Sequence, residues 1–138
     1  MTRKEILDFL NANTTSFLAT VENGEPRVRG MALYKADDDG ILYHTGSIKD
    51  IASQLKVNPI AELCVFDPKS GVQIRVRGTS EFIDDRTIKD EMMAKRPFLK
   101  PVVDAYGYDA LVVFRLVDCQ ATVWTMSTNA EPKIWIKL

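Results

Sequence analysis

The chain has few of the residues from which metal sites and disulfides are built. Its 138 residues include one histidine, His44, and two cysteines, Cys64 and Cys119, which lie far apart and outside any Cys-x-x-Cys pattern. A structural zinc ion takes about four such ligands, so the sequence predicts no metal site. We expect both cysteines to be small core residues in a reducing compartment, which makes a cytoplasmic location the default expectation.

The sequence also lacks a large net charge and a long apolar run. Lysine and arginine total 18, aspartate and glutamate total 19, and the net charge is -1. This balance favours neither a nucleic acid nor an anionic membrane as a partner. No apolar stretch is long enough to span a bilayer, and residues 1–5 do not resemble the start of a signal peptide. The length predicts a single domain over residues 1–138.

Common catalytic patterns are missing as well. No serine–histidine–aspartate order, paired-carboxylate motif or glycine-rich nucleotide loop stands out in the sequence. His44 is the only side chain that titrates near neutral pH. A lone histidine is more often a hydrogen-bonded structural residue than an acid or a base, so no catalytic residue is assigned.

A strand that leads directly into a helix organises the chain. The alternation over Ile41–Thr45 predicts a strand, which Gly46 ends. Ser47 fits a helix N-cap, with Asp50 in the capping-box position, and the helix is predicted to run to residue 57. Unpaired N–H groups at a helix start, the hydroxyl groups of this stretch and the Lys49 ammonium together favour a bound phosphate. An ordinary capped surface helix is the alternative.

The remaining patterns predict a mainly β protein with some α structure. Strands are expected at 15–21, 26–35, 41–45, 60–66, 72–83, 110–117 and 120–126, and helices at 2–12, 47–57 and 84–95. The first three strands form an antiparallel meander with a turn at Asn23–Gly24, and Gly78 marks a bend or bulge. The apolar tail, 132–138, is expected to dock on its own domain or on a partner. About six strands with inserted helices indicate an α+β antiparallel barrel.

Two of the predicted strands carry pairs of arginines on one face. The shared faces are Arg27, Arg29, Met31, Leu33 and Lys35 in one strand, and Gln73, Arg75, Arg77 and Thr79 in the other. Paired arginines suit a phosphate or a carboxylate, whereas a solvated outer face is the plain alternative. Gly30 lets a flat group approach the backbone, and Trp124 is either a core or an interface residue.

Taken in order, these motifs resemble those of a known family. They are Arg29–Tyr34, then Tyr43–Lys49, then Asn58–Pro59, then Gln73–Gly78. Their order and spacing are similar to those of the pyridoxamine 5′-phosphate oxidase-like family of FMN-binding split barrels, from about residue 17 to residue 82 and more weakly as far as residue 124. The resemblance implies a six-stranded split barrel with short flanking helices, in a homodimer that holds two FMN molecules at the subunit interface.

The resemblance also implies which residues bind the phosphate and the ring of FMN. Arg29 and Lys49 would bind the FMN phosphate, helped by the Ser47 hydroxyl. The backbone around Met31 and Ala32 would run beside the isoalloxazine ring. These assignments agree with the independent expectation of an anion at the helix start.

The remaining cofactor-binding residues implied by the resemblance come from four parts of the chain. Gly30 precedes the backbone that would lie along the ring. His44 and Thr45 occupy the strand end beside the flavin. Gln73 corresponds to a glutamine that contacts the cofactor, and Trp124 to an aromatic residue that often reaches FMN from the other subunit. A homodimer would therefore complete each site.

The sequence departs from the family pattern at the substrate positions. Tyr34 stands where the true oxidase has a substrate-binding lysine, Ile48 replaces a basic residue, and the later substrate-phosphate set and C-terminal arginine motif are not recognisable. These departures argue against vitamin B6 oxidation. We expect an FMN-dependent oxidoreductase that uses NAD(P)H to reduce a small acceptor such as a quinone, a nitro-aromatic or a flavin. The alternatives are an FMN electron carrier or redox sensor, a split barrel using F420 or haem, and an interaction domain without a ligand.

Overall fold

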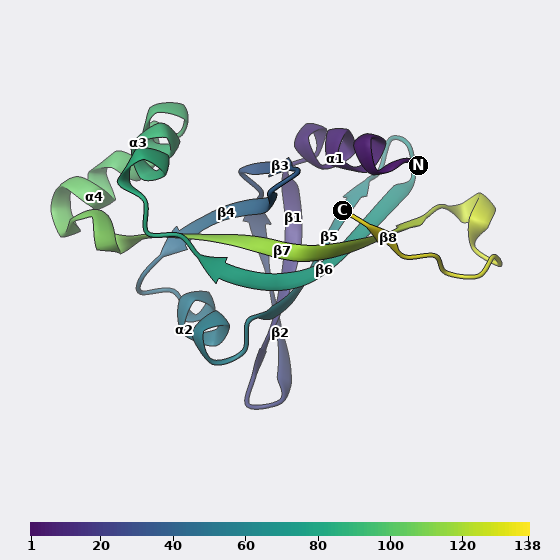
Figure 1. Ribbon diagram of the computed structural model, residues 1–138, viewed down its shortest axis with the longest axis horizontal. Coiled ribbons are helices and arrows are strands. Elements are labelled where there is room, and N and C mark those ends of the chain that lie inside the picture. The colour runs from purple at the N-terminus through teal and green to yellow at the C-terminus, as the bar shows by residue number, and fades with distance from the viewer.

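The computed structural model describes all residues from 1 to 138 and contains one antiparallel sheet with helices at its margins (Figure 1). The strands are β1 (Thr15–Glu22), β2 (Glu25–Ala32), β3 (Lys35–Asp37), β4 (Gly40–Gly46), β5 (Ile60–Asp67), β6 (Val72–Phe82), β7 (Leu111–Trp124) and β8 (Ile136–Lys137). The helices are α1 (Arg3–Ala12), α2 (Asp50–Val57), α3 (Arg86–Lys95) and α4 (Lys100–Tyr106), with short turns η1 (Pro97–Leu99), η2 (Tyr108–Ala110) and η3 (Met126–Thr128). None of the helices has the length and apolar character needed to cross a bilayer.

The sheet curls into a barrel because its two ends are close in the chain. The strand order is β2-β1-β5-β6-β7-β4-β3, which puts β2 and β3 at opposite ends of the hydrogen-bonded path. Only Leu33 and Tyr34 separate these two strands in the sequence, so the ends of the sheet must meet. A sheet whose ends meet closes into a barrel. The predicted α+β split barrel is confirmed, with β3 and β8 as two short strands beyond the expected six.

The predicted meander is wrong at its second connection. Strand β2 ends at Ala32 instead of continuing to residue 35. The Leu33 amide donates to the Thr14 carbonyl, and the Tyr34 amide donates to the Leu42 carbonyl. The chain therefore changes pairing partner at this point, and β4 pairs with β7 instead of β2. This change of partner is what leaves the barrel open along one seam.

The basic face of β2 is correspondingly shorter than predicted. Arg27, Arg29 and Met31 lie opposite Thr20, Leu18 and Ser16 of β1 and share one face of the sheet. Leu33 lies beyond the end of the strand and is fully buried, and Lys35 belongs to β3. The face therefore ends at Met31, because the strand ends where the barrel turns its corner.

The last two predicted strands form one bent strand. Strand β7 runs without a break from Leu111 to Trp124, and Asp118 adopts a φ of 52° within it. Opposite this bend the β6–β7 register shifts between Arg77 and Thr79, so the predicted bulge at Gly78 is confirmed. A Cβ atom on Gly78 would lie 2.9 Å from the Cys119 sulfur, which leaves room only for glycine.

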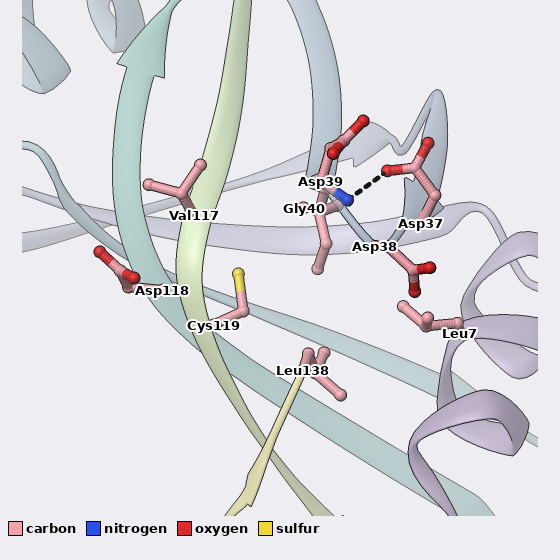
Figure 2. A pocket seen from close by; sticks show the side chains of 10 residues that line it. Leu7, Asp37, Asp38, Asp39, Gly40, Val117, Asp118, Cys119 and Leu138 are labelled. Atoms are coloured by element: carbon pink, nitrogen blue, oxygen red, sulfur yellow. Dashed lines mark hydrogen bonds between the residues drawn. The ribbon is translucent and has the colours of Figure 1, made fainter.

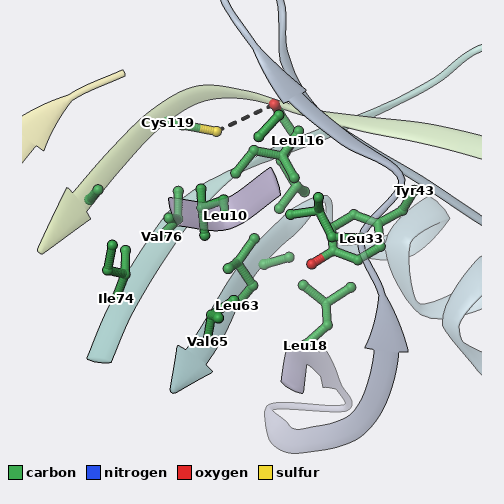
Figure 3. Packing of buried hydrophobic residues seen from close by; sticks show 14 of the residues in the cluster. Leu10, Leu18, Leu33, Tyr43, Leu63, Val65, Ile74, Val76, Leu116 and Cys119 are labelled. Atoms are coloured by element: carbon green, nitrogen blue, oxygen red, sulfur yellow. Dashed lines mark hydrogen bonds between the residues drawn. The ribbon is translucent and has the colours of Figure 1, made fainter. Parts of the chain in front are cut away.

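Helix α1 covers one end of the barrel and completes its core. Thr2 and Glu5 form the predicted capping box, and Ile6 and Leu10 are fully buried. Figure 3 shows how apolar side chains from α1 and the strands face one another inside the sheet. The cluster includes Leu18, Leu33, Ile41, Tyr43, Leu63, Val65, Ile74, Val76, Phe114 and Leu116. Removal of these side chains from water is the main contribution that stabilises the barrel.

The apolar tail docks on its own sheet. Strand β8 pairs with β7, and the Leu138 amide donates to the Cys119 carbonyl at 3.0 Å. The side chains of Ile136 and Leu138 pack against the main core. The Arg77 guanidinium lies 4.1 Å from the ring centroid of Trp135. Of the two docking modes expected from the sequence, the tail therefore uses the contact with its own domain.

A buried hydrogen-bonded chain joins β4 to β1 and β2. The Ser16 hydroxyl donates to the Met31 carbonyl at 2.8 Å and lies 2.7 Å from the Tyr43 hydroxyl. Because a serine has one hydroxyl hydrogen, the Tyr43 hydroxyl must be the donor to Ser16. Burial raises the pKa of Tyr43, which keeps this donor protonated.

The substitution Tyr43→Phe is expected to lower the free energy of unfolding by about 1 kcal/mol. It removes the hydrogen bond and keeps the ring, which stacks on Phe114 with centroids 5.4 Å apart. Ser16→Ala is the comparison, because it leaves the fully buried Tyr43 hydroxyl without a partner and should cost about 2 kcal/mol. Urea denaturation measures both losses. Equal stability of Tyr43→Phe and the natural chain would contradict a stabilising role for this bond.

Candidate cofactor-binding site

A tight turn links β4 to α2. The helix begins at Asp50, and its N-cap is Lys49, whose side chain makes no capping hydrogen bond. The Ser47 amide donates to the Ala110 carbonyl and the Lys49 amide to the Gly46 carbonyl, each at 3.0 Å. The prediction that Ser47 caps the helix is therefore wrong, because the turn holds Ser47 against the start of β7 and moves the helix start three residues on.

The start of α2 still presents unpaired donors. The backbone amides of Ile48, Asp50 and Ile51 donate to no acceptor in the protein. Ser47, Ile48 and Lys49 are exposed, so their hydroxyl, amide and ammonium groups face solvent. Unpaired N–H groups and the helix dipole both favour an anion at this place. The expected phosphate-binding turn is thus shifted in detail and keeps its chemical character.

Arg29 reaches toward α2 from β2. Its Nη1 donates to the Leu18 carbonyl at 3.2 Å and the Thr20 hydroxyl at 2.8 Å, and its Nη2 donates to Gln54 Oε1 at 2.5 Å. A guanidinium has five N–H donors, so subtracting these three leaves Nε–H and one Nη2–H. The Thr20 hydroxyl and Gln54 Oε1 are themselves 2.6 Å apart, so both occupy the outer end of the guanidinium. The two remaining donors form a parallel fork along its side edge.

The charge of Arg29 has no direct counterion. No carboxylate forms an ion pair with it. Burial lowers the pKa of Arg29, and the charge of Asp50 in the first turn of α2 partly opposes that shift. Gln54 is buried, and its Nε2 donates to Glu22 at 2.9 Å. The Gln54 side chain that accepts from Arg29 is therefore itself fixed by a hydrogen bond. The guanidinium is therefore held in place by uncharged groups, and its fork has no carboxylate partner.

Sequence reasoning missed Thr20 and Gln54. Both side chains are almost fully buried, at 2% and 4% exposure. Thr20 follows Leu18 on the inward face of β1, and Gln54 lies on the buried face of α2 with Ile51 and Leu55. A polar side chain at a position of apolar periodicity must find a hydrogen-bonding partner. A polar residue at a position where the periodicity predicts an apolar one was therefore the feature of the sequence that could have indicated this hydrogen-bonded network.

His44 lies near the end of β4 with one ring nitrogen engaged. Arg96 Nη1 is 2.7 Å from His44 Nε2, and the rings of Tyr34 and Phe98 flank the imidazole with centroids 6.5 and 6.4 Å away. Burial, reinforced by the Arg96 charge, lowers the pKa of His44 to about 4. The imidazole is therefore neutral at pH 7. Arg96 follows α3 in a stretch without periodicity, so nothing in the sequence indicated this contact.

Arg96 also joins the end of β2 to β4. Its Nη2 donates to the Leu33 carbonyl at 2.8 Å and its Nη1 approaches the Ala32 carbonyl at 3.4 Å. Eight of the predicted residues lie in three segments that these bonds and the Arg29–Gln54 bond connect, namely the end of β2, the end of β4 and the turn into α2. We call this region the β2–β4–α2 corner. The eight residues are Arg29, Gly30, Met31, Ala32, His44, Thr45, Ser47 and Lys49.

The other two predicted residues lie away from this corner. Gln73 pairs with Trp124 across β6 and β7, and the indole N–H of Trp124 donates to Asn129 at 2.8 Å. Strands β1 and β5 separate β6 from β2, which amounts to roughly 14 Å at the usual strand spacing. In Figure 1 the end of β7 lies on the opposite side of the molecule from α2. One chain therefore does not bring Gln73 or Trp124 to Arg29.

Gly30 and Gln73 nevertheless share one face of the sheet. Gly30 pairs with Phe17, Phe17 with Cys64, and Cys64 with Arg75, two residues from Gln73. We call this the outer sheet face. It exposes three large apolar side chains, Phe17 (56%), Val28 (69%) and Phe66 (52%). Arg29 and Met31 point to the opposite face.

The two cysteines differ in their surroundings. Cys119 is buried in the main core, as expected. Cys64 lies on the outer sheet face and is only partly buried, so the prediction of a core position is wrong for it. Its alternation with the buried Leu63 and Val65 on β5 is the reason, because neighbouring residues of a strand point to opposite faces.

Two hollows in the chain lie outside the β2–β4–α2 corner. One, of about 280 Å³, is lined by three consecutive aspartates of the β3–β4 turn, by Asp118 and by Cys119 (Figure 2). Its carboxylates would repel an anion, and no group of three or more His, Cys, Asp or Glu side chains is placed to hold a metal ion. The other, of about 480 Å³, lies between β3, β4 and α3. Neither is lined by Arg29, Ser47 or Lys49.

The chain is an antiparallel split barrel with basic side chains on β2 and in the turn before α2. The family model described as pyridoxamine 5′-phosphate oxidase matches residues 2–112. The chain belongs to the pyridoxamine 5′-phosphate oxidase family. The resemblance inferred from the motifs is thereby confirmed.

Curated relatives extend well beyond the matched region. The pyridoxine/pyridoxamine 5′-phosphate oxidase of Actinobacillus succinogenes is 35% identical over 95 residues, which cover 67% of this chain and 44% of that protein. The enzyme of the same name from Mycobacterium leprae is 31% identical over 80 residues, covering 58% and 36%. The chain thus spans less than half the length of these relatives.

Solved structures share the fold over almost the whole chain. A NimC/NimA family protein from Clostridium acetobutylicum aligns with a TM-score of 0.80 at 23% identity, covering 98% of this chain and 92% of that one. General stress protein 26 from Bacillus anthracis gives 0.74 at 18% identity and covers 100% of both chains. A pyridoxamine 5′-phosphate oxidase-related, FMN-binding protein from Nostoc punctiforme gives 0.67 at 17% identity, covering 99% and 96%.

Proposed function

We propose that this chain binds FMN at the β2–β4–α2 corner and acts as an FMN-dependent oxidoreductase. The observation that carries the proposal is the Arg29 guanidinium, whose side edge has no partner and whose Nη2 bonds to Gln54 of α2, the helix whose first amides are unpaired. A phosphate dianion can accept hydrogen bonds from both, and Lys49 adds a second positive charge in the same turn. Membership of the family supports FMN as the ligand whose phosphate binds there.

The residues around the corner also fit a planar ring. Gly30 carries no side chain, so a flat group can approach the backbone of the edge strand β2, where a Cβ atom would meet only the Phe17 ring at 3.9 Å. Arg96 holds the carbonyls of Ala32 and Leu33, which keeps the end of β2 in one conformation. FMN, when bound, supplies reversible hydride transfer at its isoalloxazine ring. The chain's own contribution is to bind the phosphate and orient the ring.

We further propose that the active form is a homodimer with one FMN site at each end of the interface. Gln73 and Trp124 are roughly 14 Å or more from β2 within one chain, so a second copy is the natural source of these contacts. The apolar side chains of the outer sheet face support such an interface. Residues 1–138 would then form the single domain of each subunit.

The reaction we propose is NAD(P)H-linked reduction of a small acceptor, such as a quinone, a nitro-aromatic or a flavin. Tyr34 replaces the lysine of the true oxidase, and its hydroxyl donates to Glu91 at 3.3 Å. This arrangement argues against the vitamin B6 substrates of the longer relatives. A haem at His44 loses support, because Nε2 faces Arg96. Two unpaired cysteines support the cytoplasmic location that we propose.

The absorption spectrum of the purified protein tests the proposal directly. We expect a yellow protein whose released cofactor is FMN, and an NAD(P)H oxidation that depends on added acceptor. Riboflavin is the matched control ligand, because it has the same ring and no phosphate; we expect it to bind at least about 100-fold more weakly than FMN. A colourless protein that takes up no added FMN would contradict the proposal, and equal binding of the two flavins would contradict the phosphate site.

A further inference from the structure

We infer that Arg96 is a positioning residue that fixes His44, at the β2–β4–α2 corner, as the neutral Nδ1–H tautomer. The ligand's identity as FMN rests on the proposed function, whereas the state of the imidazole does not. No motif in the sequence pointed to Arg96, which comes from the end of α3, 52 residues after His44.

The geometry of the contact determines which nitrogen carries the proton. Arg96 Nη1 and His44 Nε2 are 2.7 Å apart. A guanidinium has only donors and stays protonated in proteins, so His44 Nε2 must accept with its lone pair. A neutral imidazole whose Nε2 accepts carries its hydrogen on Nδ1. Protonation of Nε2 would set two N–H groups, and two positive charges, against each other.

The guanidinium is held by groups other than His44. Its Nη2 donates to the Leu33 carbonyl at 2.8 Å, and its carbon lies 5.1 Å from the ring centroid of Tyr34. The backbone amide of Arg96 donates to the Met92 carbonyl at 2.7 Å and closes the end of α3. Arg96 therefore has contacts that do not involve His44 and that hold its guanidinium beside the imidazole.

No carboxylate offsets this arrangement. The groups that face His44 are Arg96, the Tyr34 ring, the Phe98 ring and Val113 of the neighbouring strand β7. The nearest charged groups on α3 after Arg96 are Glu91 and Lys95, which bond to each other and approach the Tyr34 side chain. Burial and the Arg96 charge both lower the pKa of His44, in agreement with the geometry.

The fixed tautomer restricts what His44 can do. Its Nε2 lone pair is not available to a proton or a metal ion, so His44 is not a general base through this nitrogen. Its Nδ1–H is a donor whose protonation does not change between about pH 5 and pH 8, because the pKa of His44 is about 4. The tautomer and the charge of His44 are then independent of pH between about pH 5 and pH 8.

The single histidine of the chain makes a direct test possible. Nitrogen-15 NMR of the full-length protein, labelled at histidine, reports the protonation of each ring nitrogen and its titration. We expect one imidazole with Nδ1 protonated and Nε2 unprotonated at neutral pH, and no titration down to about pH 5. An Nε2–H tautomer, or a midpoint near the ordinary value of 6.5, would overturn the inference.

Two variants separate the role of Arg96 from general effects of charge. Arg96→Met removes the donor and the charge, so we expect a midpoint raised by about one unit or more and a population with Nε2 protonated. Arg86→Gln is the control, because it removes a positive charge from the other end of α3, and the His44 spectrum should not change. An unchanged His44 spectrum in Arg96→Met would overturn the inference. If Arg96→Met does not fold, the spectrum of the natural protein still decides the tautomer.

The outcome is distinguishable from failure of the proposed function. The spectra are recorded without FMN and again after FMN is added to saturation. A fixed Nδ1–H tautomer in a protein that takes up no FMN would support this inference and contradict the FMN proposal. A protein that binds FMN and has the Nε2–H tautomer would support the FMN proposal and contradict this inference.

Discussion

Substitution of Arg29 by alanine is expected to weaken FMN binding about 10- to 150-fold, as the loss of charge-assisted hydrogen bonds worth about 1.5–3 kcal/mol requires. The guanidinium uses its outer end on Thr20 and Gln54 and leaves its side edge for the phosphate. Alanine removes that fork. Titration of the apoprotein with FMN, followed by flavin fluorescence, measures the dissociation constant.

The control for this prediction is Arg27→Ala on the same strand. Arg27 shares the face of Arg29 and pairs with two carboxylates, Glu25 at 3.1 Å and Glu22 at 4.0 Å, so its loss removes the same charge from a side chain that already has counterions. We expect less than about a threefold effect on FMN binding, as for an exposed ion pair. Riboflavin should bind equally to the natural chain and to Arg29→Ala. A similar loss for riboflavin and FMN would show that Arg29 acts on the fold or the ring.

Arg29→Lys separates charge from geometry at the same position. Lysine keeps a positive charge on β2 and cannot form the parallel fork. We expect FMN affinity between those of the alanine variant and the natural chain. Thermal unfolding of each variant without FMN measures how much of any change comes from the released Gln54, which is buried.

Substitution of Phe17 by aspartate is expected to convert the proposed dimer to a monomer and to abolish retention of FMN. Phe17 lies on β1, between β2 and β5, on the outer sheet face, and is 56% exposed in the single chain. A carboxylate buried at a two-fold interface is desolvated on both subunits, at a cost of several kcal/mol. Light scattering after size exclusion gives the mass, and the absorbance of the same peak gives the bound FMN.

Val57→Asp is the matched control for this second prediction. Val57 ends α2, is 88% exposed and lies off the outer sheet face, so the same kind of change should leave the mass and the FMN content unaltered. Circular dichroism checks that the Phe17 variant keeps its sheet, which an exposed position permits. A Phe17→Asp protein that remains dimeric would place the interface elsewhere, and a monomer that retains FMN would show that one chain completes the site.

Local patterns in the sequence predicted much of this molecule, because short-range chemistry decides them. The Thr2–Glu5 capping box, the Asn23–Gly24 turn and the bulge at Gly78 all occur where expected. Ordered motifs also indicated the family. Each of these features depends on residues that are close to one another in the sequence, so it can be predicted from the sequence alone.

Pairing between distant strands was predicted less well. The meander over residues 15–45 is right for the hairpin of β1 and β2 and wrong for the next connection, because β3 intervenes and β4 finds its long partner in β7, some seventy residues later in the chain. The helix start moved from Ser47 to Asp50 for a similar reason: the Ser47 amide bonds to Ala110. Alternation along a strand says which residues share a face and says nothing about which strand lies beside it.

By itself, the sequence determined the strands, their faces, the turns and the motif order, since these follow from local backbone preferences and from the periodic burial of apolar side chains. Only the tertiary structure decided which polar groups meet. It brought Gln54 to Arg29 and Arg96 to His44, and it kept Gln73 and Trp124 apart from both. The physical reason is that a hydrogen bond depends on distances of a few ångströms between atoms. The separation of two residues in the sequence does not determine the distance between their atoms; the folded barrel does.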